Sequence, residues 1–198
     1  MATFAYLDAL AALESENGVI AFPTDTVYGI GCLIDRPKAI EKIYRMKGRD
    51  ENKPLILLGY DSESFEEHLD TTNVHQVARD YMTQHWPGSL TLVLPKSATL
   101  PTAVTRNMET IGLRVPDCET LREFLKIIPG GAIATTSANR SGDLPCLTAD
   151  QVLRTFGDDL DYVIADDESL KSGTPSTVAG VSPTGAVHIF RQGAIVLD

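Results

Sequence analysis

The segment AIATTSANRSG, residues 132–142, changes from apolar to polar within a few residues and guides the interpretation of the whole chain. Its first part, Ala132 to Thr136, is typical of a buried strand. The segment then places a hydroxyl at Ser137 and an amide at Asn139, which in an extended chain point to the same side. A capped turn is the alternative, because Ser, Asn and Gly are also common turn formers.

On both sides of this segment, helical and extended patterns alternate. Residues 71–73 are typical of a helix cap, and Thr148 with Gln151 forms a capping box. Helices are predicted at 4–13, 36–46, 74–86, 121–128 and 148–156, and strands at 18–22, 55–58, 90–94, 110–115, 132–136, 163–165, 177–181 and 187–190. This interleaving predicts an α/β fold with a mixed sheet. Because no repeat or composition break is present, one domain spanning residues 1–198 is expected.

The composition limits the functions to consider. The 198 residues are 43% hydrophobic and 22% charged, which is typical of a globular protein. The formal net charge of −10 argues against non-specific binding to nucleic acid or to an anionic membrane, so a site for a polyanion must be a local positive cleft. No apolar run approaches the roughly 20 residues of a membrane helix. Arg36 is the first basic residue, and the three cysteines are far apart, so a cytoplasmic protein with buried neutral thiols is predicted.

Polar clusters follow several predicted strands. In the first, residues 23–29, the hydroxyls of Thr24, Thr26 and Tyr28 would line a pocket where strand 18–22 ends. The alternative, favoured when this cluster is taken alone, is a polar turn in which Asp25 and Thr26 bond their own backbone. The loop at 172–178 is also rich in hydroxyls, and Arg191 follows a later strand, although a linker and a surface arginine would explain both.

Basic residues concentrate at the end of helix 36–46. Seven of the 17 Lys and Arg residues fall between residues 36 and 53, and several of them form a solvated helix face. Lys47, Arg49 and Lys53 differ because they lie in a glycine-containing loop that is predicted to be mobile. A mobile loop with several cationic donors suits a triphosphate, since Arg binds two oxygens at once and Lys acts as a point charge.

Several common motifs are missing from the sequence. It contains no GxGxxG, GxxxxGK[ST], GxSxG or HExxH, and its four histidines have no ligand-like spacing. The sequence therefore predicts neither a covalent nucleophile nor a structural metal. The hydroxyls, amide and cations at the predicted strand ends suit the binding and orientation of an anion.

Seven segments taken in order resemble one family. They are FPTDTVYGIG (22–31), KGRDENKPL (47–55), WPGSLTLVL (86–94), IGLRVP (111–116), TTSANRSG (135–142), PSTV (175–178) and FRQG (190–193). Together they resemble the threonylcarbamoyl-AMP synthases of the YrdC/Sua5 (TsaC) family in their short, single-domain form. The resemblance implies a twisted open α/β sheet, flanked by helices, with a concave and positively lined cleft. It also implies a reaction that joins L-threonine, bicarbonate and ATP into threonylcarbamoyl-AMP and pyrophosphate.

The resemblance also implies roles for individual residues. Lys47 and Arg49 match the family's K-x-R pair and are the expected catalytic residues. Ser137 and Asn139 match its S-x-N pair. The positions expected to bind threonine are Thr26, Tyr28, Arg114, Ser137 and Ser176, with Arg114 opposite the carboxylate. Those expected to bind ATP are Lys47, Arg49, Lys53, Thr110, Asn139, Thr148 and Arg191. Mg²⁺ is expected to arrive with ATP, with no metal held by the protein itself.

Three positions depart from the family pattern. Leu58 stands where long-form members often have a histidine, Asp50 replaces the proline after K-x-R, and Lys53 replaces an asparagine. The product is expected to pass to the tRNA threonylcarbamoyl-transferase complex, which modifies adenosine 37, while direct tRNA binding stays open. The alternatives are a paralogue of different activity on the same fold, an RNA-binding or ribosome-assembly module, and a carbamoyl-phosphate-type hydrolase.

Overall fold

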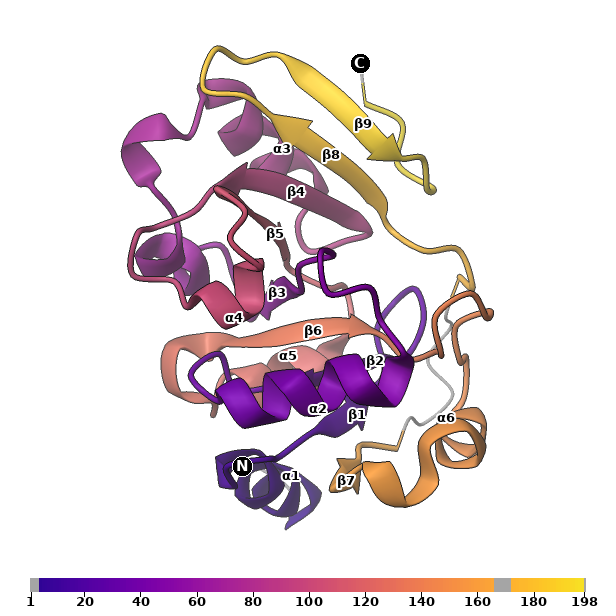
Figure 1. Ribbon diagram of the computed structural model, residues 1–198. Coiled ribbons are helices and arrows are strands. Elements are labelled where there is room, and N and C mark those ends of the chain that lie inside the picture. The colour runs from indigo at the N-terminus through magenta and orange to yellow at the C-terminus, as the bar shows by residue number, and fades with distance from the viewer. Residues whose placement is uncertain (1–3, 166–171, 198) are drawn as a thin grey trace.

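The computed structural model describes residues 4–165 and 172–197, and one mixed sheet runs through them. Its strands are β1 (Ile20–Phe22), β2 (Gly29–Cys32), β3 (Ile56–Gly59), β4 (Leu90–Pro95), β5 (Thr110–Arg114), β6 (Ala132–Ser137), β7 (Tyr162–Val163), β8 (Thr177–Val181) and β9 (Val187–Arg191). Their spatial order is β7-β1-β2-β6-β3-β5-β4-β8-β9 (Figure 1). Parallel and antiparallel pairs alternate irregularly, which confirms the predicted α/β class with a mixed sheet.

Helices flank the sheet on both sides. They are α1 (Phe4–Glu14), α2 (Pro37–Lys47), α3 (Gln76–His85), α4 (Thr102–Thr105), α5 (Glu119–Leu125) and α6 (Ala149–Phe156). Short 3₁₀ turns lie at Glu63–His68, Thr71–Asn73, Pro129–Gly131 and Gly157–Asp159. Helix α2 lies in front of β6 and β2, and α5 lies behind them (Figure 1). Among the described residues, no helix is long and apolar enough to cross a membrane.

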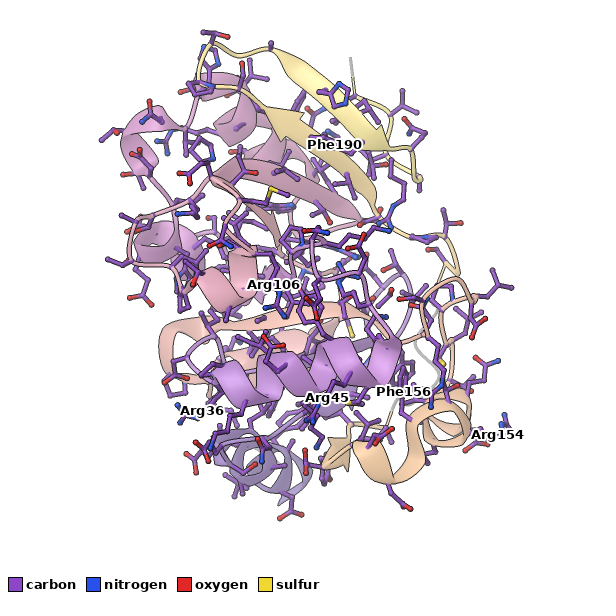
Figure 2. All side chains as sticks on the ribbon, in the orientation of Figure 1. Arg36, Arg45, Arg106, Arg154, Phe156 and Phe190 are labelled. Carbon is purple, nitrogen blue, oxygen red and sulfur yellow. The ribbon has the colours of Figure 1, made fainter. Side chains whose placement is uncertain are left out.

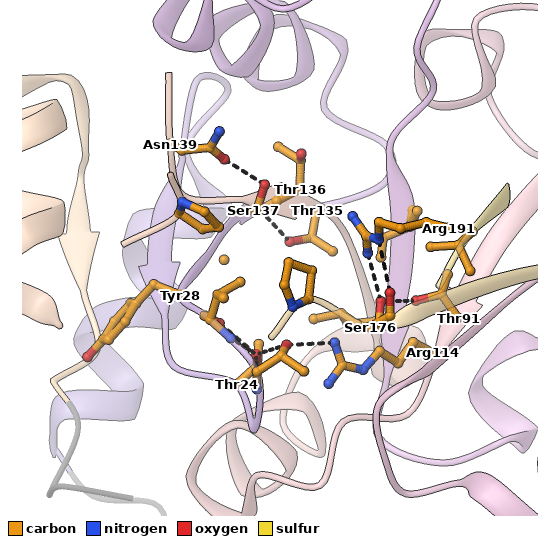
Figure 3. A pocket seen from close by; sticks show the side chains of 18 of the residues that line it. Thr24, Tyr28, Thr91, Arg114, Thr135, Thr136, Ser137, Asn139, Ser176 and Arg191 are labelled. Atoms are coloured by element: carbon orange, nitrogen blue, oxygen red, sulfur yellow. Dashed lines mark hydrogen bonds between the residues drawn. The ribbon is translucent and has the colours of Figure 1, made fainter. Parts of the chain in front are cut away.

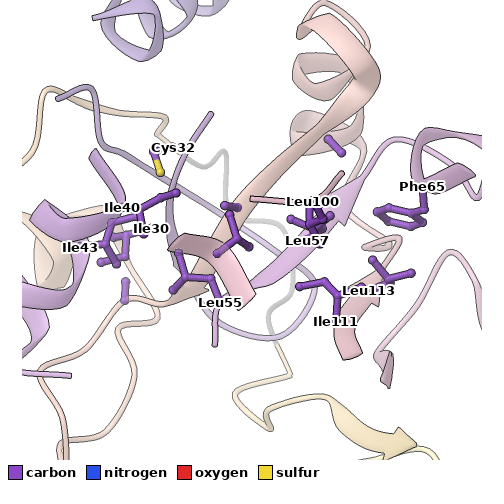
Figure 4. Close-up of a cluster of buried hydrophobic side chains, with 14 of the residues drawn as sticks. Ile30, Cys32, Ile40, Ile43, Leu55, Leu57, Phe65, Leu100, Ile111 and Leu113 are labelled. Atoms are coloured by element: carbon purple, nitrogen blue, oxygen red, sulfur yellow. The ribbon is translucent and has the colours of Figure 1, made fainter. Parts of the chain in front are cut away.

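Two apolar cores lie on opposite faces of the sheet because strand side chains alternate between faces. The larger core joins Ile30 of β2 and Leu57 of β3 to Ile40 and Ile43 of α2 (Figure 4). The smaller core joins Phe22 of β1 and neighbouring strand residues to α1 and α5.

Strand β6, the AIATTS part of the opening segment, lies between β2 and β3 and is antiparallel to both. Ile133 belongs to the smaller core and Ala134 to the larger one. By the same alternation, Thr135 and Ser137 face the side of the smaller core, whereas Thr136 faces the side of α2. The strand therefore presents polar side chains to both sides at its end.

The structure differs from the sequence prediction at several points, and helix α4 was not predicted. Strand β2 was not predicted, because its sequence GIGC is rich in glycine and lacks strand propensity. Its glycines are used for packing: a Cβ at Gly29 would lie 2.6 Å from the ring of buried Phe22. Helix α3 is capped by His75, whose side chain accepts a hydrogen bond from Val77 N, and not by residues 71–73. Helix α2 continues through Lys47.

Candidate active site

A cavity of about 390 Å³ opens on the face of the sheet that carries the smaller core (Figure 3). Side chains from β3, β4, β5, β6 and β8 line it, together with loops from distant parts of the chain. The lining residues are Thr24, Thr26, Val27, Tyr28, Gly29, Arg49, Ile56, Leu58, Thr91, Arg114, Thr135, Thr136, Ser137, Asn139, Asp143, Pro145, Pro175, Ser176, Val178 and Arg191. The polar clusters predicted from the sequence therefore converge on one hollow.

The loop after β1 forms a self-bonded turn at the cavity. Thr24 Oγ1 accepts hydrogen bonds from the backbone N–H groups of Thr26 and Val27, and it donates to Val27 O at 2.6 Å. It lies 2.9 Å from Thr26 Oγ1. Each interpretation of this cluster holds in part. The polar turn is present, but Thr24 makes its backbone bonds, whereas Asp25 pairs with Arg114. Thr24 and Thr26 also line the cavity, as the pocket interpretation expected.

Tyr28 adjoins the cavity but turns its phenol away from it (Figure 3). The side chain is fully buried in the larger core, and its hydroxyl donates to Ile164 O at 3.4 Å. Burial raises the pKa of Tyr28 to about 12. The hydroxyl therefore faces away from a ligand in the cavity, although the residue was expected to contact threonine.

Arg114, at the end of β5, is almost fully buried and forms an ion pair with Asp25 at 2.5 Å. Its Nε donates to Gly88 O at 2.9 Å, and one terminal nitrogen donates to Thr26 Oγ1 at 2.9 Å. Burial lowers its pKa, and the nearby Asp25 carboxylate counteracts that effect. The guanidinium has five N–H bonds, so two remain for a ligand beyond these acceptors. Sequence analysis missed Asp25 as the partner, since the two residues lie 89 positions apart.

A second arginine, Arg191, lies on the same side of the cavity as Arg114 (Figure 3). Arg191 donates from Nε to Ser176 O at 3.0 Å and from a terminal nitrogen to Ser176 Oγ at 3.1 Å. The Ser176 hydroxyl lies 2.8 Å from Thr91 Oγ1. Thr91 was not predicted, because a threonine within the apolar run of β4 carries no signal of its own. It aligns the hydroxyl of Ser176 from the strand beside it.

Arg49 reaches the cavity from the loop after α2. Its three nitrogens donate to Lys53 O at 3.1 Å, to Pro54 O at 2.8 Å and to Thr136 Oγ1 at 3.2 Å. The side chain is only half-buried. The guanidinium is thus held beside the end of β6 while part of it stays open to a ligand.

Lys47 does not lie in a loop, and its expected exposure is wrong. It is the last residue of α2 and is only 3% exposed. Its Nζ donates to Ser137 O at 2.5 Å, to Asn139 O at 2.6 Å and to Asn139 Oδ1 at 3.2 Å. These three oxygens match the three N–H bonds of an ammonium group. Burial, and then the positive charge of Arg49, lower the pKa of Lys47 to about 7. Lys47 therefore joins the end of α2 to the turn after β6.

Ser137 ends β6 and Asn139 stands in the turn that follows. Ser137 Oγ donates to Asn139 Oδ1 at 2.6 Å, and the Asn139 amide donates to Arg140 O and Asp143 O. The two predicted alternatives are combined here, because the strand delivers Ser137 and the turn delivers Asn139. Both residues line the cavity.

Besides Lys47, three predicted ATP-binding residues lie outside the cavity lining. Lys53 and Thr148 are exposed, and the Thr148 hydroxyl caps α6 by accepting from Gln151 N at 3.2 Å. Thr110 begins β5, at the opposite end of the strand from Arg114. Residues 166–171, which directly precede the hydroxyl-rich loop at 172–178, lie outside the described residues.

The charges around the cavity are mixed, so a positive cleft stays a prediction. The cavity is lined by Arg49, Arg114 and Arg191 together with Asp143. The charge of Arg114 is balanced by its ion pair with Asp25. Within residues 4–165 and 172–197, no group of three or more His, Cys, Asp or Glu side chains could hold a metal ion. The three cysteines are buried and free, as predicted.

Known proteins resemble this chain over nearly its full length. A family model for the Sua5, YciO and YrdC proteins, described as "Telomere recombination", matches residues 12–193. The threonylcarbamoyl-AMP synthase of Idiomarina loihiensis is 35% identical over 179 residues, which cover 90% of this chain and 94% of that protein.

Solved structures are similar as well. P. abyssi Sua5 complexed with L-threonine is 30% identical, with a TM-score of 0.85 over 98% of this chain. This chain spans only 56% of the length of that Sua5 chain. E. coli YciO is 23% identical, with a TM-score of 0.82 over 98% of this chain and 92% of YciO, and supports the fold alone.

Proposed function

The chain belongs to the Sua5–YciO–YrdC family, and from this premise we propose that it is an L-threonylcarbamoyladenylate synthase, a nucleotidyltransferase of tRNA modification. One observation carries the proposal: groups suited to an amino-acid carboxylate and groups suited to a nucleotide phosphate line a single cavity. The similarity to a synthase over nine-tenths of the chain supports the same activity. The acidic protein is proposed to act in the cytoplasm.

The amino acid is proposed to bind between the Thr24–Thr26 turn and β8. The carboxylate of L-threonine would accept hydrogen bonds from the two remaining N–H groups of Arg114. Thr26 and Ser176 would provide hydroxyls on either side. Arg–carboxylate pairs favour two parallel hydrogen bonds, which would fix the orientation of the substrate. The apolar side chains of Ile56, Leu58 and Val178 also line the cavity and would adjoin the rest of the amino acid.

The nucleotide is proposed to lie along the end of β6. Arg49 would bind phosphate oxygens, while Ser137 and Asn139 would contact both substrates where they meet. Direct contact between Lys47 and a phosphate would require Nζ to leave three oxygens. Lys47 is therefore proposed to act by shaping the Ser137–Asn139 turn.

Two bond-forming steps follow from these substrates. The amine of L-threonine attacks the carbon of CO₂ and forms a carbamate as one amine proton leaves to solvent. With bicarbonate, that proton leaves together with the displaced hydroxide as water. A carbamate oxygen then attacks the α-phosphorus of ATP. The bond to the bridging oxygen breaks, and pyrophosphate leaves with the electron pair. Because no protein atom forms a covalent bond, catalysis would rest on alignment, worth about 7–11 kcal/mol when the geometry is good, and on charge neutralisation by Arg49.

Mg²⁺ would enter the site with the triphosphate and reduce the negative charge of its oxygens. The described residues offer Asp143 as a carboxylate on the cavity lining, and Asp25 is already paired with Arg114. This donor set fits an ion carried by phosphate oxygens and water. The product would pass to a tRNA threonylcarbamoyl-transferase.

The test is turnover of the purified protein with ATP, bicarbonate and L-threonine, with pyrophosphate and the adenylate both measured. Pyrophosphate release that depends on threonine supports the synthase. Arg49→Ala should abolish it, whereas Arg45→Ala, which changes an exposed arginine of the preceding helix α2, should keep it. A folded protein that releases no threonine-dependent pyrophosphate would contradict the proposal and favour a paralogue of different activity.

A further inference from the structure

We propose that Tyr44 is a positioning residue that orients Arg49 for the nucleotide; this inference rests on the proposed function. Tyr44 lies on α2, is 4% exposed and does not line the cavity. It acts on the reaction only through the arginine that follows it by five positions. Neither the motifs of the sequence nor the lining of the cavity points to this residue.

Tyr44 contacts the Arg49 region in three separate ways. Its backbone oxygen accepts from Arg49 N at 3.0 Å, which turns the chain sharply at the end of α2. Its hydroxyl donates to Lys53 O at 2.7 Å, and Arg49 Nε donates to the same oxygen at 3.1 Å. Its ring centroid lies 5.9 Å from Arg49 Cζ, within the range of a cation–π contact. The tyrosine therefore fixes both the carbonyl that Arg49 binds and the space beside its guanidinium.

The tyrosine ring is itself held from another side. Arg106 Cζ lies 3.8 Å from the ring centroid, and the same guanidinium forms an ion pair with Glu41 of α2 at 2.7 Å. Figure 2 labels Arg106 next to α4. Arg106 ends α4 in a left-handed conformation with φ 50°, and its N donates to Thr102 O at 2.7 Å. A non-glycine residue in this conformation is uncommon, so the surrounding contacts must hold it there. Tyr44 thus has little freedom to move away from Arg49.

The arrangement matters because Arg49 stands in a loop. An arginine side chain loses rotamer entropy when a ligand immobilises it. Here Lys53 O, Pro54 O and Thr136 Oγ1 already fix the guanidinium before a ligand arrives. Lys53 O is the acceptor that Tyr44 holds in place. A guanidinium that is ordered in advance loses less entropy when it binds phosphate. The effect on the amino acid should be smaller, because its proposed site lies beside other strands.

The experiment compares Tyr44→Phe, which keeps the ring and removes the hydroxyl, with Tyr44→Leu, which removes both. We expect Tyr44→Phe to raise the KM for ATP about fivefold, as loss of one hydrogen bond does, and Tyr44→Leu to raise it further. The KM for threonine should change less than about twofold. Tyr60→Phe is the matched control, because Tyr60 packs near Lys126 and away from the cavity, and both KM values should stay unchanged.

A double-mutant cycle tests whether Tyr44 acts through Arg49. Because Arg49→Ala should abolish turnover, the cycle measures the calorimetric affinity for a non-hydrolysable ATP analogue, and Tyr44→Phe should not lower that affinity further in an Arg49→Ala background. An equal effect in both backgrounds, a parallel rise of both KM values, or wild-type kinetics for Tyr44→Phe would each overturn the proposal.

Calorimetric binding of a non-hydrolysable ATP analogue separates this inference from the proposed function. If the wild-type protein shows no turnover but Tyr44→Phe still lowers the affinity for the analogue about fivefold, the synthase activity is refuted and the positioning role is supported. A wild-type protein that does not bind the analogue would overturn both.

Discussion

Replacing Asp25 by alanine should destabilise the protein strongly, because it leaves the Arg114 guanidinium buried without its counter-charge. Arg114 is 4% exposed, and its ion pair with Asp25 spans 2.5 Å. Removal of one partner from a buried pair typically costs 3–5 kcal/mol, so we expect a loss of about 4 kcal/mol in the free energy of unfolding. Asp25→Asn keeps an oxygen of similar size and should cost about half as much, because a neutral acceptor bonds the guanidinium less strongly.

Urea denaturation followed by the fluorescence of Trp86, the single tryptophan, measures both variants. Glu16→Ala is the control, since it breaks an ion pair with Lys38 whose side chains are 67% and 61% exposed. That exposed pair should contribute less than about 1 kcal/mol. The double variant Asp25→Ala with Arg114→Met should recover much of the loss, because it leaves no unpaired charge. A cost below about 1 kcal/mol for Asp25→Ala would refute the reasoning.

Three further predictions concern other contacts of the site. The Lys47 pKa falls from 10.5 in the unfolded chain to about 7 in the fold, so between these values the unfolded state binds more protons. Above about pH 7, the free energy of unfolding should therefore rise by up to about 1.4 kcal/mol per pH unit relative to that of Lys47→Met. Urea titrations at several pH values measure this difference, and parallel pH profiles for the two proteins would contradict it. Gly29→Ala should cost about 1–3 kcal/mol in thermal unfolding, because its Cβ would lie 2.6 Å from the Phe22 ring. Thr91→Val removes a 2.8 Å contact with Ser176 and should raise the KM for threonine about fivefold; an unchanged KM would separate Thr91 from the site.

The sequence predicted the cavity where polar residues follow strands. Arg114 and Ser137 end their strands, and Ser176 directly precedes β8. Thr26 lies in the loop between β1 and β2, and all four residues line the same hollow. Such positions carry a readable signal, because an apolar run that ends in hydroxyls and charges indicates where the backbone leaves the core. Their role in binding threonine stays a prediction.

Other features depend on contacts that no local pattern records. Lys47 was expected in an exposed loop, yet one more residue of helix α2 buries it against the turn after β6. Thr148 was predicted both to form a capping box and to bind ATP. In the structure its hydroxyl caps helix α6, and the residue does not line the cavity. Strand β2 was missed because its glycines weaken the propensity that prediction depends on, while they permit close packing against Phe22.

The strand order has a consequence for biosynthesis. Residues that surround the hollow range from Thr24 to Arg191, and β4 meets its neighbour β8 only after the intervening chain has been made. Translation proceeds at about 5–20 residues per second, so the binding surface stays incomplete for the seconds between synthesis of Thr24 and synthesis of Arg191. Activity should therefore require synthesis through Arg191 and should not grow in proportion to the length of the nascent chain.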